Sequence, residues 1–149
     1  MGKLSMTRSE REEFLAGFHV GVISIAEEGR GPLSIPIWYD YVPGGEVRIV
    51  TGADSRKLVL LRRTGRFTLC AQDENPPYRY VTVEGPVVGI EPASVEDDER
   101  PLAHRYLGPE LGDAYVAATT VEAGPSNVLV RMRPERWATV DYRKEYGGA

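Results

Sequence analysis

The stretch "VTGADSRKLVLLRRTG", residues 50–65, joins the end of a strand-like run to a helix-like run through a short turn. Asp54 or Ser55 is suited to cap the helix, and Gly65 is suited to end it. Lys57 lies in the first turn of this helix and is one of three lysines in a chain that has fifteen arginines. The pattern predicts a strand–turn–helix unit whose first helical N–H groups have no partners inside the helix and point outward.

This corner has the chemistry of a binding site for a doubly charged anion. Outward N–H groups and the helix dipole attract negative charge. Ser55 offers a hydroxyl, Arg56 a fork of donors and Lys57 a mobile positive charge. Because the dipole disfavours cations at this end of a helix, two of them here indicate a bound anion. The alternative is a capped helix whose two basic side chains are merely solvated.

Length and composition exclude several classes of protein. We expect a single domain over residues 1–149, with residues 1–8 flexible. The net charge of −4 argues against broad nucleic-acid binding, and no apolar run approaches the length of a membrane span. The single Cys70 excludes an internal disulfide, and the separation of His19 from His104 does not indicate a metal site. We therefore expect a cytoplasmic protein that binds no metal, nucleic acid or membrane.

Short strand-like runs in hairpin order predict an antiparallel barrel with flanking helices, an α+β but mainly β fold. Helix-like segments lie near the N-terminus, after the third strand and over residues 94–119. The expected strands are residues 19–26, 33–42, 47–52, 66–72, 79–92, 128–133 and 136–142.

Three local features refine this prediction. Ser9 with Glu12 is a candidate capping box for the first helix, which Gly17 would end. Pro36 cannot donate to a strand ladder, so the strand that contains it is expected at an edge or at a bulge. The long strand over residues 79–92 is expected to bend at Gly85 and the proline that follows it.

Together these motifs resemble the pyridoxamine 5'-phosphate oxidase-like split-barrel flavoproteins. In that family a strand that ends in Thr is followed by a turn and by "SRK" at the start of a helix, as at residues 51–57 here. The run "RYVTVEG", residues 79–85, resembles the family strand that ends in "EG". "GPLSIPIWY", residues 31–39, and "RW", residues 136–137, stand in the matching order. The resemblance covers nearly the whole chain and implies an antiparallel split β-barrel.

Departures from the family pattern narrow the implied function. The basic strand and the C-terminal Arg-Leu motif of true pyridoxamine-phosphate oxidases are absent, and Tyr80 stands where they carry Gln, so that activity is not expected. The short chain and "PIWY", residues 36–39, look more like the actinobacterial branch that uses the deazaflavin coenzyme F-420. This resemblance implies an oxidoreductase that transfers a hydride from the reduced cofactor to an unsaturated small organic substrate. An FMN-dependent enzyme, a non-catalytic deazaflavin-binding or storage protein and a cofactor-free scaffold remain open.

The resemblance also implies the residues of the site. The expected cofactor-binding residues are Pro36, Trp38, Val50, Thr51, Ser55, Arg56, Lys57, Gln72 and Tyr80. The first four would flank the ring or ribityl chain, and the next three would hold the phosphate. The last two would complete the pocket from a neighbouring strand or from the partner in a homodimer with cofactor sites at its interface. Because coenzyme F-420 carries an acidic oligoglutamate tail, Arg62, Arg63 and Arg66 are expected to continue a basic track.

Overall fold

The structure, a computed structural model, describes residues 2–122 and 127–146. The elements in chain order are α1 (Arg8–Ala16), β1 (Gly21–Ile25), β2 (Leu33–Ile37), β3 (Asp40–Tyr41), β4 (Val47–Gly52), α2 (Arg56–Thr64), β5 (Arg66–Asp73), β6 (Arg79–Pro92), the π-helical turn η1 (Val95–Glu99), α3 (Arg100–Glu122), β7 (Asn127–Met132), β8 (Arg136–Asp141) and α4 (Arg143–Tyr146). None of the described helices combines the length and the hydropathy that a membrane crossing needs.

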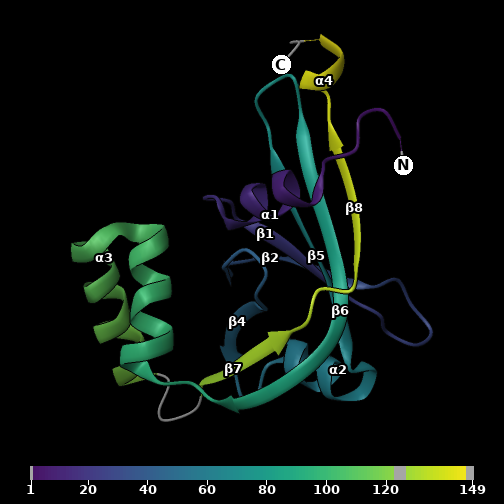
Figure 1. Cartoon of the computed structure of the whole chain (residues 1–149). Coiled ribbons are helices and arrows are strands. Elements are labelled where there is room, and N and C mark those ends of the chain that lie inside the picture. Colours follow the sequence, from purple (N-terminus) through teal and green to yellow (C-terminus); the bar gives the residue numbers. More distant parts are fainter. Residues whose placement is uncertain (1, 123–126, 147–149) are drawn as a thin grey trace.

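The described strands pair antiparallel along the path β2-β1-β5-β6-β7-β4-β3, with β8 beside β6. β6 connects the two halves of this sheet, because its first half pairs with β5 and β8 and its second half pairs with β7. Figure 1 shows β6 curving from one group of strands to the other. The change of partner falls at Pro86 and Val87, where the sequence predicted a bend. The predicted antiparallel split barrel with short flanking helices is confirmed.

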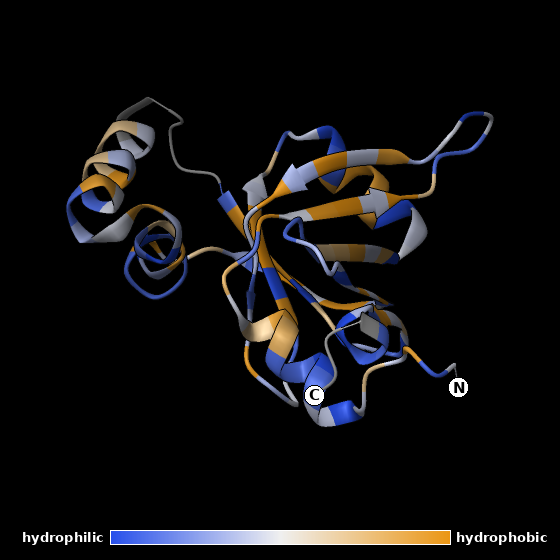
Figure 2. Cartoon of the chain, turned by 90° about the horizontal axis from the view of Figure 1, so that it is seen from above, coloured by the Kyte–Doolittle hydropathy of each residue, from blue (hydrophilic) through white to orange (hydrophobic). Residues whose placement is uncertain are grey.

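The core lies inside the curved sheet, where alternate residues of β1, β4, β5 and β6 point inward. Burial of each large aliphatic side chain contributes roughly 1.5–3 kcal/mol, so this alternation fixes which face of each strand turns inward. Figure 2 shows the strands rich in hydrophobic residues, with α3 to one side of them. The fully buried residues at these alternate positions are Ile23, Ile25, Val47, Ile49, Leu69, Val81 and Val83.

The single strand expected over residues 33–42 is two strands in the structure. β2 pairs with β1, whereas β3 pairs with β4, so the chain changes sheet partner at Trp38 and Tyr39. Tyr39 is fully buried, and its hydroxyl donates to the carbonyl oxygen of Leu15 at 2.6 Å. This anchor holds the chain where it leaves β2. Pro36 lies in an edge strand, as predicted.

The first helix begins two residues earlier than expected. Thr7, and not Ser9, is the N-cap, and it forms a capping box with Glu10 in place of the expected Glu12. The Glu10 backbone N–H donates to the Thr7 hydroxyl, and the Glu10 carboxylate accepts from the Thr7 backbone N–H at 2.7 Å. Threonine and serine are both good N-cap residues, so the sequence pattern could not distinguish Thr7 from Ser9, and the prediction of Ser9 was wrong. Gly17 ends the helix, as predicted.

The segment expected to be flexible, residues 1–8, makes specific contacts from Leu4 onward. The Leu4 carbonyl oxygen accepts from the Asp141 backbone N–H at 2.8 Å. The Met6 backbone N–H donates to the Thr139 hydroxyl at 2.9 Å, and the Met6 side chain is only 3% exposed. These contacts with β8 attach the start of the chain to the barrel.

The helical segment expected over residues 94–119 is a hairpin formed by η1 and α3. Gly108, with φ of 82°, interrupts α3 where the sequence predicted a break. Asp113 in the second arm connects the arms, because it accepts from Arg100 at 2.7 Å and lies 2.6 Å from the His104 ring nitrogen. Figure 1 shows this hairpin beside the barrel.

Candidate functional site

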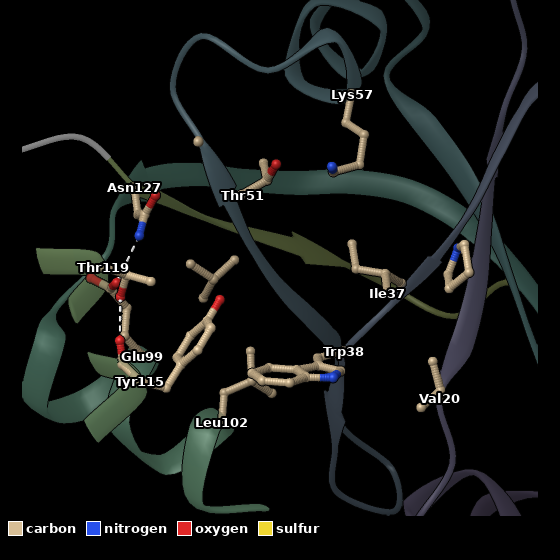
Figure 3. A pocket seen from close by; sticks show the side chains of 13 residues that line it. Val20, Ile37, Trp38, Thr51, Lys57, Glu99, Leu102, Tyr115, Thr119 and Asn127 are labelled. Atoms are coloured by element: carbon tan, nitrogen blue, oxygen red, sulfur yellow. Dashed lines mark hydrogen bonds between the residues drawn. The ribbon is translucent and has the colours of Figure 1, made fainter. Parts of the chain in front are cut away.

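A cleft of about 500 Å³ lies between the barrel and the α3 hairpin. β2, β4 and the chain just after β2 supply one wall, the start of α2 contributes one end, and η1, α3 and β7 supply the other wall. Figure 3 shows these side chains converging on a common space. Five predicted cofactor-binding residues line the cleft together: Pro36, Trp38, Val50, Thr51 and Lys57.

Ser55 stabilises the turn between β4 and α2, which forms the end of the cleft that contains Thr51 and Lys57. It caps α2, as one of the two predicted options, with its hydroxyl accepting from the Leu58 backbone N–H at 3.2 Å. The same hydroxyl lies 3.0 Å from the hydroxyl of Thr51, a residue that is only 6% exposed. Gly65 ends the helix with φ of 70°, as predicted. Ser55 therefore fixes the turn and Thr51, but is not among the residues that line the cleft.

The two basic residues that open α2 point in different directions. The Lys57 side chain extends into the cleft (Figure 3), and it makes no ion pair with any described residue. Arg56 forms an ion pair with Glu27 outside the cleft. Neighbouring helical residues project roughly 100° apart, so two adjacent cations rarely face the same ligand. The structure brings Lys57 to the candidate site and turns Arg56 away from it.

The basic track expected beyond Lys57 is not present in the described residues that line the cleft. Arg66 pairs with Glu135 at 2.9 Å, and neither Arg62 nor Arg63 in the last turn of α2 contributes to the cleft. Within the described lining, Lys57 is the one cation and a glutamate from η1 is the one carboxylate. Nor do the described residues hold a group of three or more His, Cys, Asp or Glu side chains arranged for a metal ion.

Gln72 and Tyr80 do not join the cleft. They are direct cross-strand partners on β5 and β6, at positions that face away from the core. Gln72 lines a separate hollow on the outside of the sheet, and Tyr80 is 37% exposed. Val20 and Pro36 line both this outer hollow and the cleft, so the two concavities adjoin.

The wall that α3 supplies was not predicted. Tyr115 packs against Trp38 with ring centroids 5.2 Å apart, and Tyr106 stacks on Trp38 at 5.1 Å with an interplanar angle of 3°. Leu102 and Thr119 complete this side of the cleft. Tyr106 follows Leu102 by four residues, and Thr119 follows Tyr115 by four. That helical spacing marks a shared face, and it is the signal that could have identified them.

The aromatic stack is tied to the barrel by hydrogen bonds. The Tyr106 hydroxyl donates to the His19 carbonyl oxygen at 2.6 Å and accepts from the Tyr39 backbone N–H at 3.2 Å. Burial raises the pKa of the Tyr39 hydroxyl, which keeps it a donor to the Leu15 carbonyl oxygen well above neutral pH. Burial also lowers the pKa of His19, which favours the neutral imidazole. The position of α3 over Trp38 is therefore set by both packing and polar contacts.

Glu99 and Asn127 form a polar pair in the cleft, near the turn that precedes α2. The Asn127 side-chain amide donates to a Glu99 carboxylate oxygen at 2.7 Å, as the dashed line in Figure 3 shows. Asn127 is also the cross-strand partner of Gly52 in β4. Nothing in the sequence pattern joined these residues, because η1, β4 and β7 are far apart in the chain.

Sequence comparisons find neither a matching family model nor a matching curated protein. Comparison of structures finds 91 matching chains. A conserved hypothetical protein from Mycobacterium tuberculosis is 24% identical with a TM-score of 0.77, over 97% of this chain and 90% of that one. A protein titled F-420 reductase is 20% identical with a TM-score of 0.66, over 85% and 94% of the two chains.

A third structure is titled putative pyridoxamine 5'-phosphate oxidase, from Listeria innocua. It is 13% identical with a TM-score of 0.62, and the match covers 89% of this chain and 96% of that one. This chain has the pyridoxamine 5'-phosphate oxidase-like split-barrel fold. The split-barrel resemblance seen in the sequence motifs is thereby confirmed at the level of the fold.

The residues of the cleft fit a flavin-type cofactor. The volume of the cleft, about 500 Å³, lies within the roughly 300–1,000 Å³ typical of small-molecule sites. Pro36, Trp38 and Val50 offer an apolar wall for a flat ring. Lys57 and Thr51 offer a cation and a hydroxyl for a phosphate. A half-buried lysine that no described carboxylate neutralises is the donor that such a phosphate needs.

Proposed function

We propose that the cleft binds a flavin-type cofactor, the deazaflavin coenzyme F-420 or alternatively FMN, and that the protein transfers a hydride from the reduced cofactor to an unsaturated small organic substrate. One observation carries this proposal: Lys57 extends without a described ionic partner into a cleft whose other end is closed by Trp38 and α3. The fold gives independent support, because a protein titled F-420 reductase and one titled FAD-binding protein share it.

Each lining residue has a distinct task in this proposal. Lys57 holds the phosphate through charge-assisted hydrogen bonds, and the buried Thr51 hydroxyl lies beside it in the same corner. Trp38 and Pro36 contact the ring and exclude water from one face. When bound, the reduced cofactor supplies the hydride, while the protein supplies position and polarity. Such chemistry needs no dedicated side-chain base.

FMN is the second candidate cofactor, and the charges of the cleft favour it. FMN ends at its phosphate, whereas coenzyme F-420 continues into an acidic tail that needs further cations. The described lining has Lys57 alone as a cation, and Arg56 and Arg66 pair with carboxylates elsewhere. The fold and the phosphate corner serve both cofactors equally.

We also propose that two copies of the chain assemble through the outer hollow. Phe18, Val20 and Val22 line it together and are 64%, 51% and 39% exposed, and neighbouring exposed apolar side chains are typical of an interaction surface. Because Val20 and Pro36 also line the cleft, a second copy seated on the hollow would lie next to the cofactor. Gln72 in the same hollow would then face that copy.

Titration with each cofactor tests the proposed site. Lys57→Ala should weaken the binding of coenzyme F-420, or of FMN, by about 10- to 150-fold, because a charge-assisted contact contributes roughly 1.5–3 kcal/mol. Binding is measured by quenching of cofactor fluorescence. Arg56→Ala is the matched control: it removes the neighbouring cation, which pairs with Glu27, and should leave affinity nearly unchanged. Unchanged affinity in the Lys57 variant would show that the phosphate lies elsewhere.

Turnover is a separate question from binding. Reduced coenzyme F-420 should be oxidised by the protein in the presence of some acceptor from a panel of quinones and unsaturated lactones. A protein that binds the cofactor tightly but oxidises it with none of these acceptors would support a storage role in place of catalysis.

A further inference from the structure

Glu99 places a negative charge in the cleft that we propose to bind a phosphate. Its side chain is half-buried and lines the cleft at the end of η1. The Asn127 amide holds one carboxylate oxygen at 2.7 Å. Asn127 pairs with Gly52, which follows Thr51 at the phosphate corner. The carboxylate is therefore fixed on the side of the cleft that adjoins this corner.

Nearby cations do not neutralise Glu99 in the described part of the chain. Arg100, the next residue, pairs with Glu96 at 3.1 Å and with Asp113 at 2.7 Å. Arg48 pairs with Asp98 at 2.7 Å. No ion pair between Glu99 and any described residue is present. No described cation is therefore paired with the Glu99 carboxylate, which lines the cleft.

The charges of the lining favour a ligand with few negative groups. Lys57 and Glu99 carry opposite charges, so the described lining has no net formal charge and Lys57 alone can attract an anion. Both groups line the same space of about 500 Å³, and at moderate salt charges are largely screened only beyond about 8–10 Å. A single phosphate can bind at Lys57, whereas each further carboxylate in the cleft is repelled by Glu99.

We infer that Glu99 selects the cofactor by the charge of its tail, lowering affinity for a cofactor with an oligoglutamate tail relative to one that ends at a phosphate. The inference rests on the proposed function, since it assigns a specificity role within the same cleft. A purely structural role would use Glu99 only to hold Asn127 and β7 in place. Glu99→Gln separates the two roles, because a glutamine oxygen can accept the same hydrogen bond without the charge.

The experiment compares two probes on matched variants. Wild type, Glu99→Gln and Glu110→Gln are titrated with FMN and with coenzyme F-420 carrying its oligoglutamate tail, at low and at high salt. Glu110 is an exposed residue of α3 outside the cleft, so its variant removes the same charge elsewhere. Glu99→Gln should raise the affinity for coenzyme F-420 about three- to tenfold more than that for FMN, and high salt should reduce this difference. Glu110→Gln should not alter the ratio.

Two results would overturn the inference. If Glu99→Gln leaves the ratio of the two affinities unchanged while both cofactors bind, Glu99 does not select the tail and the proposed site survives. If neither cofactor binds wild type or any variant, the proposed function falls together with the inference. Lys57→Ala is the reference for the site itself, because it should weaken the binding of both cofactors and leave the ratio of their affinities unchanged.

Discussion

Gly85 shows how one residue sets the geometry of the barrel. It ends the "VEG" run of β6, just before the strand changes partner from β5 to β7. A Cβ there would collide with the backbone carbonyl oxygen of Arg133, which cannot move aside as a side chain can. Only glycine therefore permits this close approach of the two backbone segments.

We expect Gly85→Ala to destabilise the protein by about 1–3 kcal/mol, the usual cost of forcing extra atoms into a packed region. The free energy of unfolding is measured by urea denaturation. Gly31→Ala is the control, because no atom lies within 4 Å of a Cβ built at that exposed glycine. Equal urea midpoints for the two variants would show that the strand relaxes without cost.

At residues 51–57, the proposed phosphate site, local rules predicted the turn and the helix cap but not the directions in which the side chains point. Thr51, Ser55 and Gly65 follow local rules of strand ends and helix caps, which depend only on near neighbours in the chain. The same rules predicted that Arg56 and Lys57 would both hold the phosphate. The structure separates them, because the partner of Arg56 is Glu27, a residue of the loop between β1 and β2 that no local pattern connects to α2.

The α3 hairpin is the element that sequence patterns described least well. Its helices and the break at Gly108 were expected, since glycine followed by proline interrupts a helix. Its role as a wall of the cleft was not, because helical periodicity shows that a face is apolar and does not show what the face contacts. Trp38, which it covers, is 68 residues away from Tyr106 along the chain. Contacts of that kind are set by the whole fold.

The contact between the two arms of the α3 hairpin should depend on the charge of Asp113. The His104 hydrogen bond and the Arg100 fork lower the pKa of the Asp113 carboxyl. A lowered pKa in the folded state means that the carboxylate stabilises the hairpin fully above its ordinary value of 3.8. That contribution is lost as the pH falls through the lower folded value.

Asp113→Asn should therefore increase amide hydrogen exchange in α3 at neutral pH, and its difference from wild type should shrink once the pH falls below 3.8. Exchange is followed by mass spectrometry over the peptides of the hairpin. Glu110→Gln, the same loss of charge at an exposed residue of α3, should exchange like wild type. A difference that persists undiminished at low pH would mean that Asp113 acts through packing and not through its charge.

At the scale of the whole molecule, the outer face of β1 and β5 carries exposed apolar side chains around the outer hollow. Strand alternation places Val22 of β1 and Cys70 of β5 on this face, opposite the residues that fill the core. Val22 is 39% exposed and lines the outer hollow, yet it does not line the cleft. In the proposed dimer, a change at Val22 would therefore act on the cleft through the second copy, without altering the lining directly.

We expect wild type to sediment as a dimer and Val22→Glu to sediment as a monomer, because a carboxylate in an apolar interface is costly to desolvate. Val88→Glu is the control: Val88 is similarly exposed but lies in the second half of β6, outside the outer hollow, so this variant should remain dimeric. If cofactor sites lie at the interface, Val22→Glu should also weaken cofactor binding, although Lys57 and Trp38 are untouched. A monomeric variant that binds the cofactor as tightly as wild type would place the whole site within one chain, and a wild type that sediments as a monomer would remove the dimer altogether.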